Sequence, residues 1–203
     1  MQLFFRAYSV LSHPVFVPLY AVLLLQYANP YLFGVWLSTD YFFIIGTILF
    51  NAMFFPLITV ALMKALGFIE GYALESRYER IIVLMAVCVY YIWTFNVFIR
   101  TEYHEILSDL MLGASIGVSI ALVVHSVHQR LSWHAMGMGG LVAFVLSVAQ
   151  TVASTNMLPW AILVMLGAGL TGTARLYLGK HDMEEVVRGY WLGFLSMTIA
   201  LLL

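Results

Sequence analysis

Long apolar segments separated by short polar connections make up most of the chain. A helix needs about 20 mostly apolar residues to cross a hydrocarbon core roughly 30 Å thick. Lipid offers the backbone no hydrogen-bond partners, so such segments form helices rather than open sheets. The predicted spans are residues 14–27, 41–63, 81–99, 106–127, 135–152, 157–174 and 184–203. The pattern therefore predicts an all-α, polytopic transmembrane helix bundle of six to seven spans, with residues 1–203 forming a single domain.

Local features refine the first two spans. The aromatic residues before position 14 favour a helix that begins in the membrane interface, and the aromatic-rich segment 28–40 suits a turn at the level of the lipid head groups. Pro56 predicts a kink in the second span. No small-residue cleavage pattern follows the first apolar segment, which favours a retained helix over a signal peptide.

The polar connections predict which parts of the chain share a side of the membrane. If all seven segments cross, the connections 64–80, 128–134 and 175–185 lie on one side, and they hold most of the charge. Only Arg100, of the nine Lys and Arg residues, falls on the opposite side. By the positive-inside rule, the charged side faces the cytoplasm.

Composition agrees with a membrane protein and excludes several other classes. The chain is 63% hydrophobic and 9% charged, with a mean hydropathy of +0.96, whereas soluble proteins are about 25% charged. The net charge of −1 argues against nucleic acid as a partner, because no basic patch is large enough to displace phosphate counterions. Cys88 is the single cysteine, so no internal disulfide forms.

The most charged passage of the chain is residues 174–189, between the sixth and seventh spans. A charge at the centre of a bilayer costs on the order of 2.5 to 3.5 kcal/mol. Within this passage, Arg175 is followed after five residues by His181, which is followed after three residues by Glu185, and Gly189 lies four positions further on. The cost of placing these charges between two apolar spans must be offset by other interactions.

This spacing resembles the third signature of the type 2 phosphatidic acid phosphatase superfamily, which includes lipid phosphate phosphatases and vanadium haloperoxidase-like proteins. That signature reads Ser-Arg, five residues, His, three residues, Asp. Residues 132–135, Ser-Trp-His-Ala, are similar to the second signature, Pro-Ser-Gly-His, and precede the third as expected. The first signature, Lys, six residues, Arg-Pro, is matched only by Arg80, with Ala73 and Ile81 at the other two positions.

The resemblance implies a role for each matched residue. His181 would be the nucleophile that takes the phosphoryl group. Glu185 would orient its ring, and His134 would protonate the leaving oxygen and later activate water. Arg175 offers a planar fork that matches phosphate oxygens. No metal and no cofactor is required, because arginines supply the positive charge.

Two further arginines and one serine complete the predicted phosphate site. Arg80 would act as a second clamp, with Arg77 close to it on the same helix. Backbone donors near Ser132, at the start of the fifth span, would complete the anion site. The resemblance therefore implies a lipid phosphate as substrate and the bilayer as environment, in a divergent bacterial-type protein of the cytoplasmic (inner) membrane.

Each role has a structural alternative. Asp182 and Glu185 also fit a helix capping box, and Arg175, Lys180 and Arg188 also suit interfacial anchoring. His134 beside a tryptophan also fits an interfacial residue. Residues 77–80 also fit a solvated face.

The alternatives extend to other histidines and to the function. We expect His104, His125 and His128 to be surface residues, and no metal site is predicted for them. Besides a lipid phosphatase, the sequence allows a catalytically degenerate relative that binds an anionic lipid head group, or a membrane partner subunit. A homo-oligomer is also compatible. A small transporter is disfavoured because, apart from Asp109, the spans lack ionisable residues at mid-depth.

Overall fold

The computed structural model describes residues 1–28, 39–101, 105–151 and 157–203, with side chains described for all of these except residue 151. The predicted aromatic turn at 28–40 lies almost wholly outside the described residues. His104 also lies outside them. In the described ranges all regular elements are helices, and no strand is present. The elements, in chain order, are α1 (Gln2–Leu11), η1 (Pro14–Phe16), α2 (Val17–Ala28), α3 (Thr39–Thr47), η2 (Ile48–Phe54), α4 (Phe55–Ala65), α5 (Arg77–Arg100), α6 (Glu105–Ser126), α7 (Trp133–Thr151), α8 (Leu158–Tyr177) and α9 (Met183–Ala200).

The predicted all-α membrane bundle is confirmed. Among the described residues, six helical segments are long and apolar enough to cross a membrane: Gln2–Ala28, Thr39–Ala65, Arg77–Arg100, Glu105–Ser126, Trp133–Gln150 and Leu158–Tyr177. Helix α9 is also long, but it carries Glu184, Glu185 and Arg188 near its start. The protein is therefore an integral membrane helix bundle.

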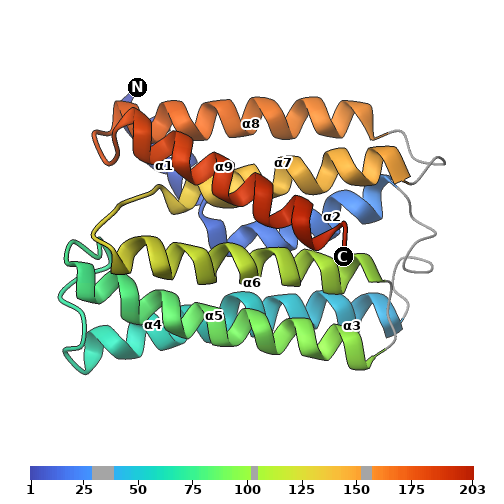
Figure 1. The fold of residues 1–203 in the computed structure, drawn as a ribbon, viewed down its shortest axis with the longest axis horizontal. Helices are drawn as coiled ribbons and strands as arrows, with labels where there is room; N and C mark the ends of the chain where they lie inside the picture. Colours follow the sequence, from blue (N-terminus) through green and yellow to red (C-terminus); the bar gives the residue numbers. More distant parts are fainter. Residues whose placement is uncertain (29–38, 102–104, 152–156) are drawn as a thin grey trace.

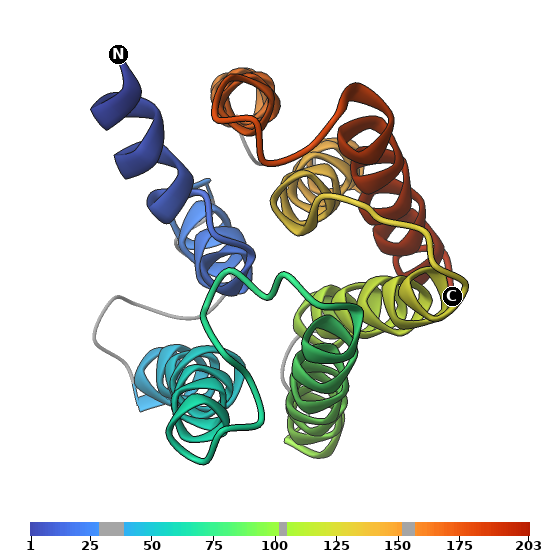
Figure 2. The ribbon, with the colours of Figure 1, turned by 90° about the vertical axis from the view of Figure 1, so that its left-hand side faces the viewer.

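The three charged connections meet at one end of the bundle, as the sequence predicts. The α4–α5, α6–α7 and α8–α9 connections all lie at the left-hand end of Figure 1, together with the N-terminus. Figure 2 views the bundle from that end, with the three connections nearest the viewer. Residues far apart in sequence are thereby brought to one polar face.

The second span is irregular, although not in the form of a simple proline kink. A π-helix, η2, spans Ile48–Phe54 and leads directly into α4, whose second residue is Pro56. Pro56 lacks a backbone N–H and cannot continue a regular ladder of helix hydrogen bonds. A π segment before it absorbs this mismatch with an extra residue in the turn.

Glycines bring α7 and α9 into close contact. A side-chain carbon added at Gly193 would meet the carbonyl oxygen of Met136, and one added at Gly189 would lie 2.5 Å from the carbonyl oxygen of Ser132. Small residues at a helix crossing let two backbones approach closely in a membrane. Gly189 therefore lets α9 pack tightly against the start of α7.

Helix α1 is fastened to α8 at the same end of the bundle. The Tyr8 hydroxyl donates to the carbonyl oxygen of Gly167 at 2.7 Å, and the rings of Phe5 and Tyr177 lie 4.7 Å apart. The start of α8 is far from α1, whereas its end, with Arg175, faces it (Figure 1). This docking brings the N-terminal helix to the charged connections.

Candidate functional site

His181, in the α8–α9 connection, forms a polar pair with Glu185 in the first turn of α9. Nδ1 of His181 lies 2.6 Å from Oε2 of Glu185. Asp182 begins α9 as its N-cap, and its Oδ1 accepts from the backbone N–H of Glu185 at 2.8 Å. Asp182 therefore caps the helix, as one half of the predicted capping box. The Glu185 carboxylate, which a full capping box would turn back to Asp182, contacts the histidine instead.

The pair fixes the chemistry of the His181 ring. A carboxylate accepts, so Nδ1 carries the proton and Nε2 keeps its lone pair. Burial lowers the pKa of His181 below its usual value, the hydrogen bond that His181 donates to Glu185 opposes this shift, and Arg175 adds to it. The two side chains are only 15% and 12% exposed. At neutral pH the ring therefore presents an unprotonated Nε2.

Arg130 is a neighbour of this pair that sequence reasoning did not assign to the site. Its Nε lies 3.7 Å from Oε1 of Glu185, so Glu185 contacts His181 through one oxygen and a cation through the other. The Arg130 side chain is 53% exposed. A partly exposed pair of this kind contributes little to stability, but it keeps positive charge at the mouth of the site.

Arg175 points inward from the last turns of α8. Its NH1 group donates to the Ser9 hydroxyl of α1 at 2.8 Å. Its Nε is buried and has no hydrogen-bond partner among the described residues. Arg175 interacts electrostatically with His134 and with His181. The guanidinium thus acts electrostatically on both predicted catalytic histidines and keeps unused donor capacity at Nε.

His134 stands in the first turn of α7 and also contacts α1. Its Nε2 lies 3.0 Å from the carbonyl oxygen of Ser9. Because a carbonyl only accepts, Nε2 carries the proton and Nδ1 has the lone pair in the neutral ring. The His13 ring packs edge-on against His134, with centroids 5.2 Å apart. His134 and His181 interact electrostatically, so they belong to one polar cluster.

Ser132 joins the second motif to the third. It is fully buried, and its hydroxyl accepts from the backbone N–H of Ala135 at 3.4 Å. Its own backbone N–H donates to the carbonyl oxygen of Glu185 at 3.0 Å. This N–H is therefore committed to the α7–α9 contact, whereas the sequence analysis assigned the backbone donors near Ser132 to the anion.

Trp133 turns toward α6. Its Nε1–H donates to Nε2 of His125 at 2.9 Å, and Nδ1 of His125 lies 3.1 Å from the carbonyl oxygen of Gln129. His125 is 2% exposed, so the expectation that it is a surface residue is wrong. His125 can be buried because both of its ring nitrogens form hydrogen bonds, one with the indole and one with a backbone carbonyl.

Arg77 and Arg80 contact main-chain carbonyls. Arg77 donates to the carbonyl oxygens of His125 and Ser126, at 3.0 and 2.5 Å, and thereby caps the end of α6. Arg80 donates to the carbonyl oxygens of Leu74 and Glu75 at 3.0 and 2.6 Å. Arg80 nevertheless interacts electrostatically with Arg130 and Glu185, and its Nε is buried without a partner in the described chain. Arg80 thus lies near the site, whereas Arg77 is engaged at α6.

Arg188 and Lys180, the other two cations of this passage, are placed as their alternative role of interfacial anchoring requires. Arg188 donates to Gln129 at 2.8 Å and to Glu184 at 2.5 Å, with 45% of its side chain exposed. Lys180 is exposed. These residues face outward, whereas Arg175 faces inward.

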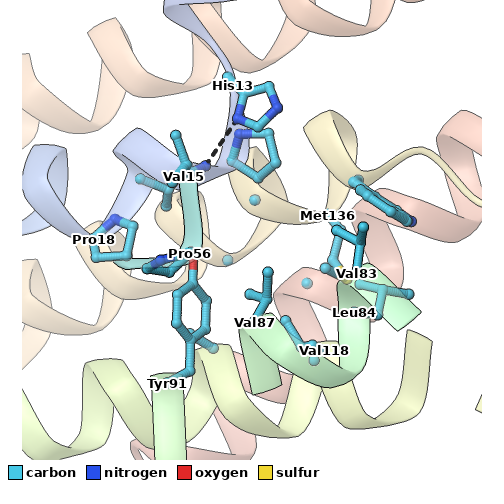
Figure 3. A pocket seen from close by; sticks show the side chains of 18 of the residues that line it. His13, Val15, Pro18, Pro56, Val83, Leu84, Val87, Tyr91, Val118 and Met136 are labelled. Carbon is cyan, nitrogen blue, oxygen red and sulfur yellow. Dashed lines mark hydrogen bonds between the residues drawn. The ribbon is translucent and has the colours of Figure 1, made fainter. Parts of the chain in front are cut away.

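An apolar cavity of about 330 Å³ adjoins the polar cluster. His13 and Trp133 line its polar end, and Figure 3 shows His13 above a wall that includes Val87, Tyr91 and Val118. Its α5 lining runs from Val83 to Tyr91, which is about 12 Å of helix. Further walls come from η1, α2, α4, α6, α7 and α9. The cavity thus reaches from the charged end toward the middle of the bundle.

Ser9, His13 and Arg130 are the site residues that sequence reasoning missed. Ser9 lies 125 residues from His134 and 166 from Arg175, and neither it nor His13 belongs to a motif. Only Arg130, two residues before Ser132, carried a signal, because it is a cation in a charged connection. No group of three or more His, Cys, Asp or Glu side chains in the described residues has a metal-binding arrangement.

Comparison of the chain with protein-family models, with curated proteins and with solved structures finds no match.

Proposed function

We propose that the protein is a membrane lipid phosphatase that hydrolyses a phosphomonoester or pyrophosphate of a membrane lipid through a phosphohistidine intermediate. The observation that carries this proposal is the 2.6 Å contact between His181 and Glu185, beside Arg175 and His134. A histidine with one nitrogen held by a carboxylate and the other unprotonated is the arrangement of an activated nucleophile.

In the proposed reaction, the Nε2 lone pair of His181 attacks phosphorus, and the bond from phosphorus to the lipid oxygen breaks. His134, in its imidazolium form with both ring nitrogens protonated, gives the Nδ1 proton to the leaving oxygen and becomes neutral. Water then attacks the phosphohistidine, His134 takes a proton from that water, and the phosphorus–nitrogen bond breaks to release phosphate. Arg175 stabilises the charge on the phosphoryl oxygens in both steps.

The cavity supports a lipid as substrate. A hydrocarbon chain buried there would leave its head group at His13 and Trp133, next to His134. Leu57 lines the cavity and is also 47% exposed on the outer surface of α4, which offers an entry route from the bilayer. A chain that moves from the bilayer into the cavity stays in apolar surroundings, so the cavity would hold it through packing contacts.

We place the site on the cytoplasmic face of a bacterial inner membrane. Support comes from the concentration of Lys and Arg at the charged end of the bundle, with Arg100 alone opposite. A homo-oligomer or a membrane partner is compatible with this arrangement.

A second candidate function is binding without turnover, as a catalytically degenerate relative that holds an anionic lipid head group. One observation favours it: Arg77 donates to two carbonyls at the end of α6, and Arg80 to two in the α4–α5 connection. These arginines have fewer donors left for phosphate than the resemblance implies.

Release of inorganic phosphate by the purified protein, measured in detergent or in vesicles over a panel of lipid phosphomonoesters and pyrophosphates, separates the two candidates. Turnover of any member supports the phosphatase. Binding of the lipids without release across the panel would favour the degenerate relative.

A further inference from the structure

Ser9 of α1 contacts both Arg175 and His134, and it does so through two different atoms. Its hydroxyl oxygen accepts from NH1 of Arg175 at 2.8 Å, and its carbonyl oxygen accepts from Nε2 of His134 at 3.0 Å. Ser9 is 8% exposed. One buried residue of the N-terminal helix thus joins the two groups that would hold and protonate a phosphate.

The position of Ser9 is set by contacts on both sides of it. Tyr8, its neighbour, donates to Gly167 of α8 at 2.7 Å, and His13, one turn further on, packs against the His134 ring. These contacts hold α1 at the end of α8 and the start of α7. Ser9 is therefore presented to the site by a docked helix.

The hydroxyl that accepts a hydrogen bond from Arg175 belongs to Ser9 and not to the residue that precedes Arg175 on α8. Ala174, the preceding residue on α8, is fully buried and has no polar group. A hydrogen bond to NH1 restrains one arm of the guanidinium and leaves Nε, which is buried without a partner in the described chain, with the other amino group for an anion. A charged group held in place loses less entropy when it binds.

We infer that Ser9 is a positioning residue of the anion site, which holds Arg175 and His134 in the arrangement that binds a phosphoryl group and makes α1 a wall of that site. The inference rests on the proposed function, since it assigns a task within the same site. Its hydroxyl restrains Arg175, and its carbonyl holds the Nε2 proton of His134, so that Nδ1 is the nitrogen free to exchange a proton.

The test compares Ser9→Ala with two other variants in one assay. Ser9→Thr keeps the hydroxyl. Ser12→Ala removes a hydroxyl at the end of the same helix that is also buried, at 5% exposed, but has no hydrogen-bond partner among the described residues. The measured quantities are KM and kcat for a lipid phosphomonoester, inhibition by orthovanadate, and the rise in Tm caused by inorganic phosphate.

Ser9→Ala is expected to raise KM and the vanadate inhibition constant about tenfold, the effect of losing a hydrogen bond to a charged group, while kcat changes less than KM. Ser9→Thr and Ser12→Ala are expected to behave like the wild type. Unchanged vanadate inhibition in Ser9→Ala, or equal losses in Ser9→Ala and Ser12→Ala, would overturn the inference.

The phosphate-induced rise in Tm separates this inference from the proposed reaction. If phosphate stabilises the wild type but the wild type releases no phosphate from lipids, the phosphatase function is ruled out. A smaller rise in Tm for Ser9→Ala than for Ser12→Ala would then still support the positioning role of Ser9. A wild type that neither releases phosphate nor is stabilised by it overturns both.

Discussion

The backbone N–H of Ser132 donates to the carbonyl oxygen of Glu185 at 3.0 Å, and this bond ties the start of α7 to the first turn of α9. His134 lies two residues after the donor, and Glu185, the acceptor, holds His181. The relative position of the two histidines therefore depends on how closely the two helix starts approach. Gly189, one turn beyond Glu185, sets that approach.

Gly189→Ala tests this dependence. Its new Cβ would lie 2.5 Å from the Ser132 carbonyl oxygen, so α7 and α9 must separate. Overpacking of this kind costs about 1 to 3 kcal/mol. We expect a lower Tm in detergent and a loss of phosphate release. Gly169→Ala is the matched control, because nothing lies within 4 Å of its Cβ position on α8. Equal behaviour of the two variants would show that the contact does not position the site.

Glu185→Gln tests the ring of His181. An amide cannot stabilise positive charge on the ring, and loss of an orienting carboxylate in a comparable triad lowers kcat by roughly 10⁴. The hydrogen bond that His181 donates to the Glu185 carboxylate raises the pKa of His181 against the effect of burial, so loss of the carboxylate lowers that pKa. Because attack needs the unprotonated ring, the acid limb of the rate profile should move to lower pH.

The pH profile of phosphate release at saturating substrate measures this shift. Glu184→Gln is the control, since Glu184 is 76% exposed and pairs with Arg188, and its profile should match that of the wild type. An acid limb that moves to higher pH in Glu185→Gln would contradict the assigned role of the pair.

The spans and their common charged end follow from the sequence, because hydrophobic length is a local property and the bilayer sets its scale. The i,i+4 contact of His181 with Glu185 is local in the same way. Contacts of Ser9 with Arg175 and His134 are not, since they arise only once α1 docks on α8 through Tyr8. The inward burial of His125 likewise depends on the distant indole that satisfies it.

Ala114→Phe tests whether the cavity holds a lipid chain. Ala114 of α6 lines the cavity, and a phenyl ring there would exclude part of a chain. The part of the chain that the ring excludes loses its packing contacts in the cavity. We expect KM to rise for a long-chain lipid phosphate and to stay constant for a short, soluble phosphomonoester.

Val123→Phe is the control for the cavity. It lies on the same helix, nine positions away, and is 63% exposed on the outer surface. Its kinetics should match those of the wild type for both substrates. If Ala114→Phe raised KM equally for long and short substrates, the cavity would not be the binding site of the lipid chain.

The sidedness of the site is tested by cysteine labelling in intact cells, in a Cys88→Ala background that removes the single native cysteine. Arg130→Cys marks the charged end, and Arg100→Cys the opposite end. A membrane-impermeant thiol reagent should label position 100 and spare position 130. The reverse pattern would place the site outside the cytoplasm.

The central claim, that His181 takes the phosphoryl group, is tested most directly by phosphate release from a lipid phosphomonoester by the wild type, His181→Ala and His128→Ala. His128 lies in the α6–α7 connection, is exposed and contacts Arg77 of α5. Its variant therefore controls for the loss of an imidazole. We predict release by the wild type and His128→Ala and none by His181→Ala. Equal release by His181→Ala and the wild type would contradict the account.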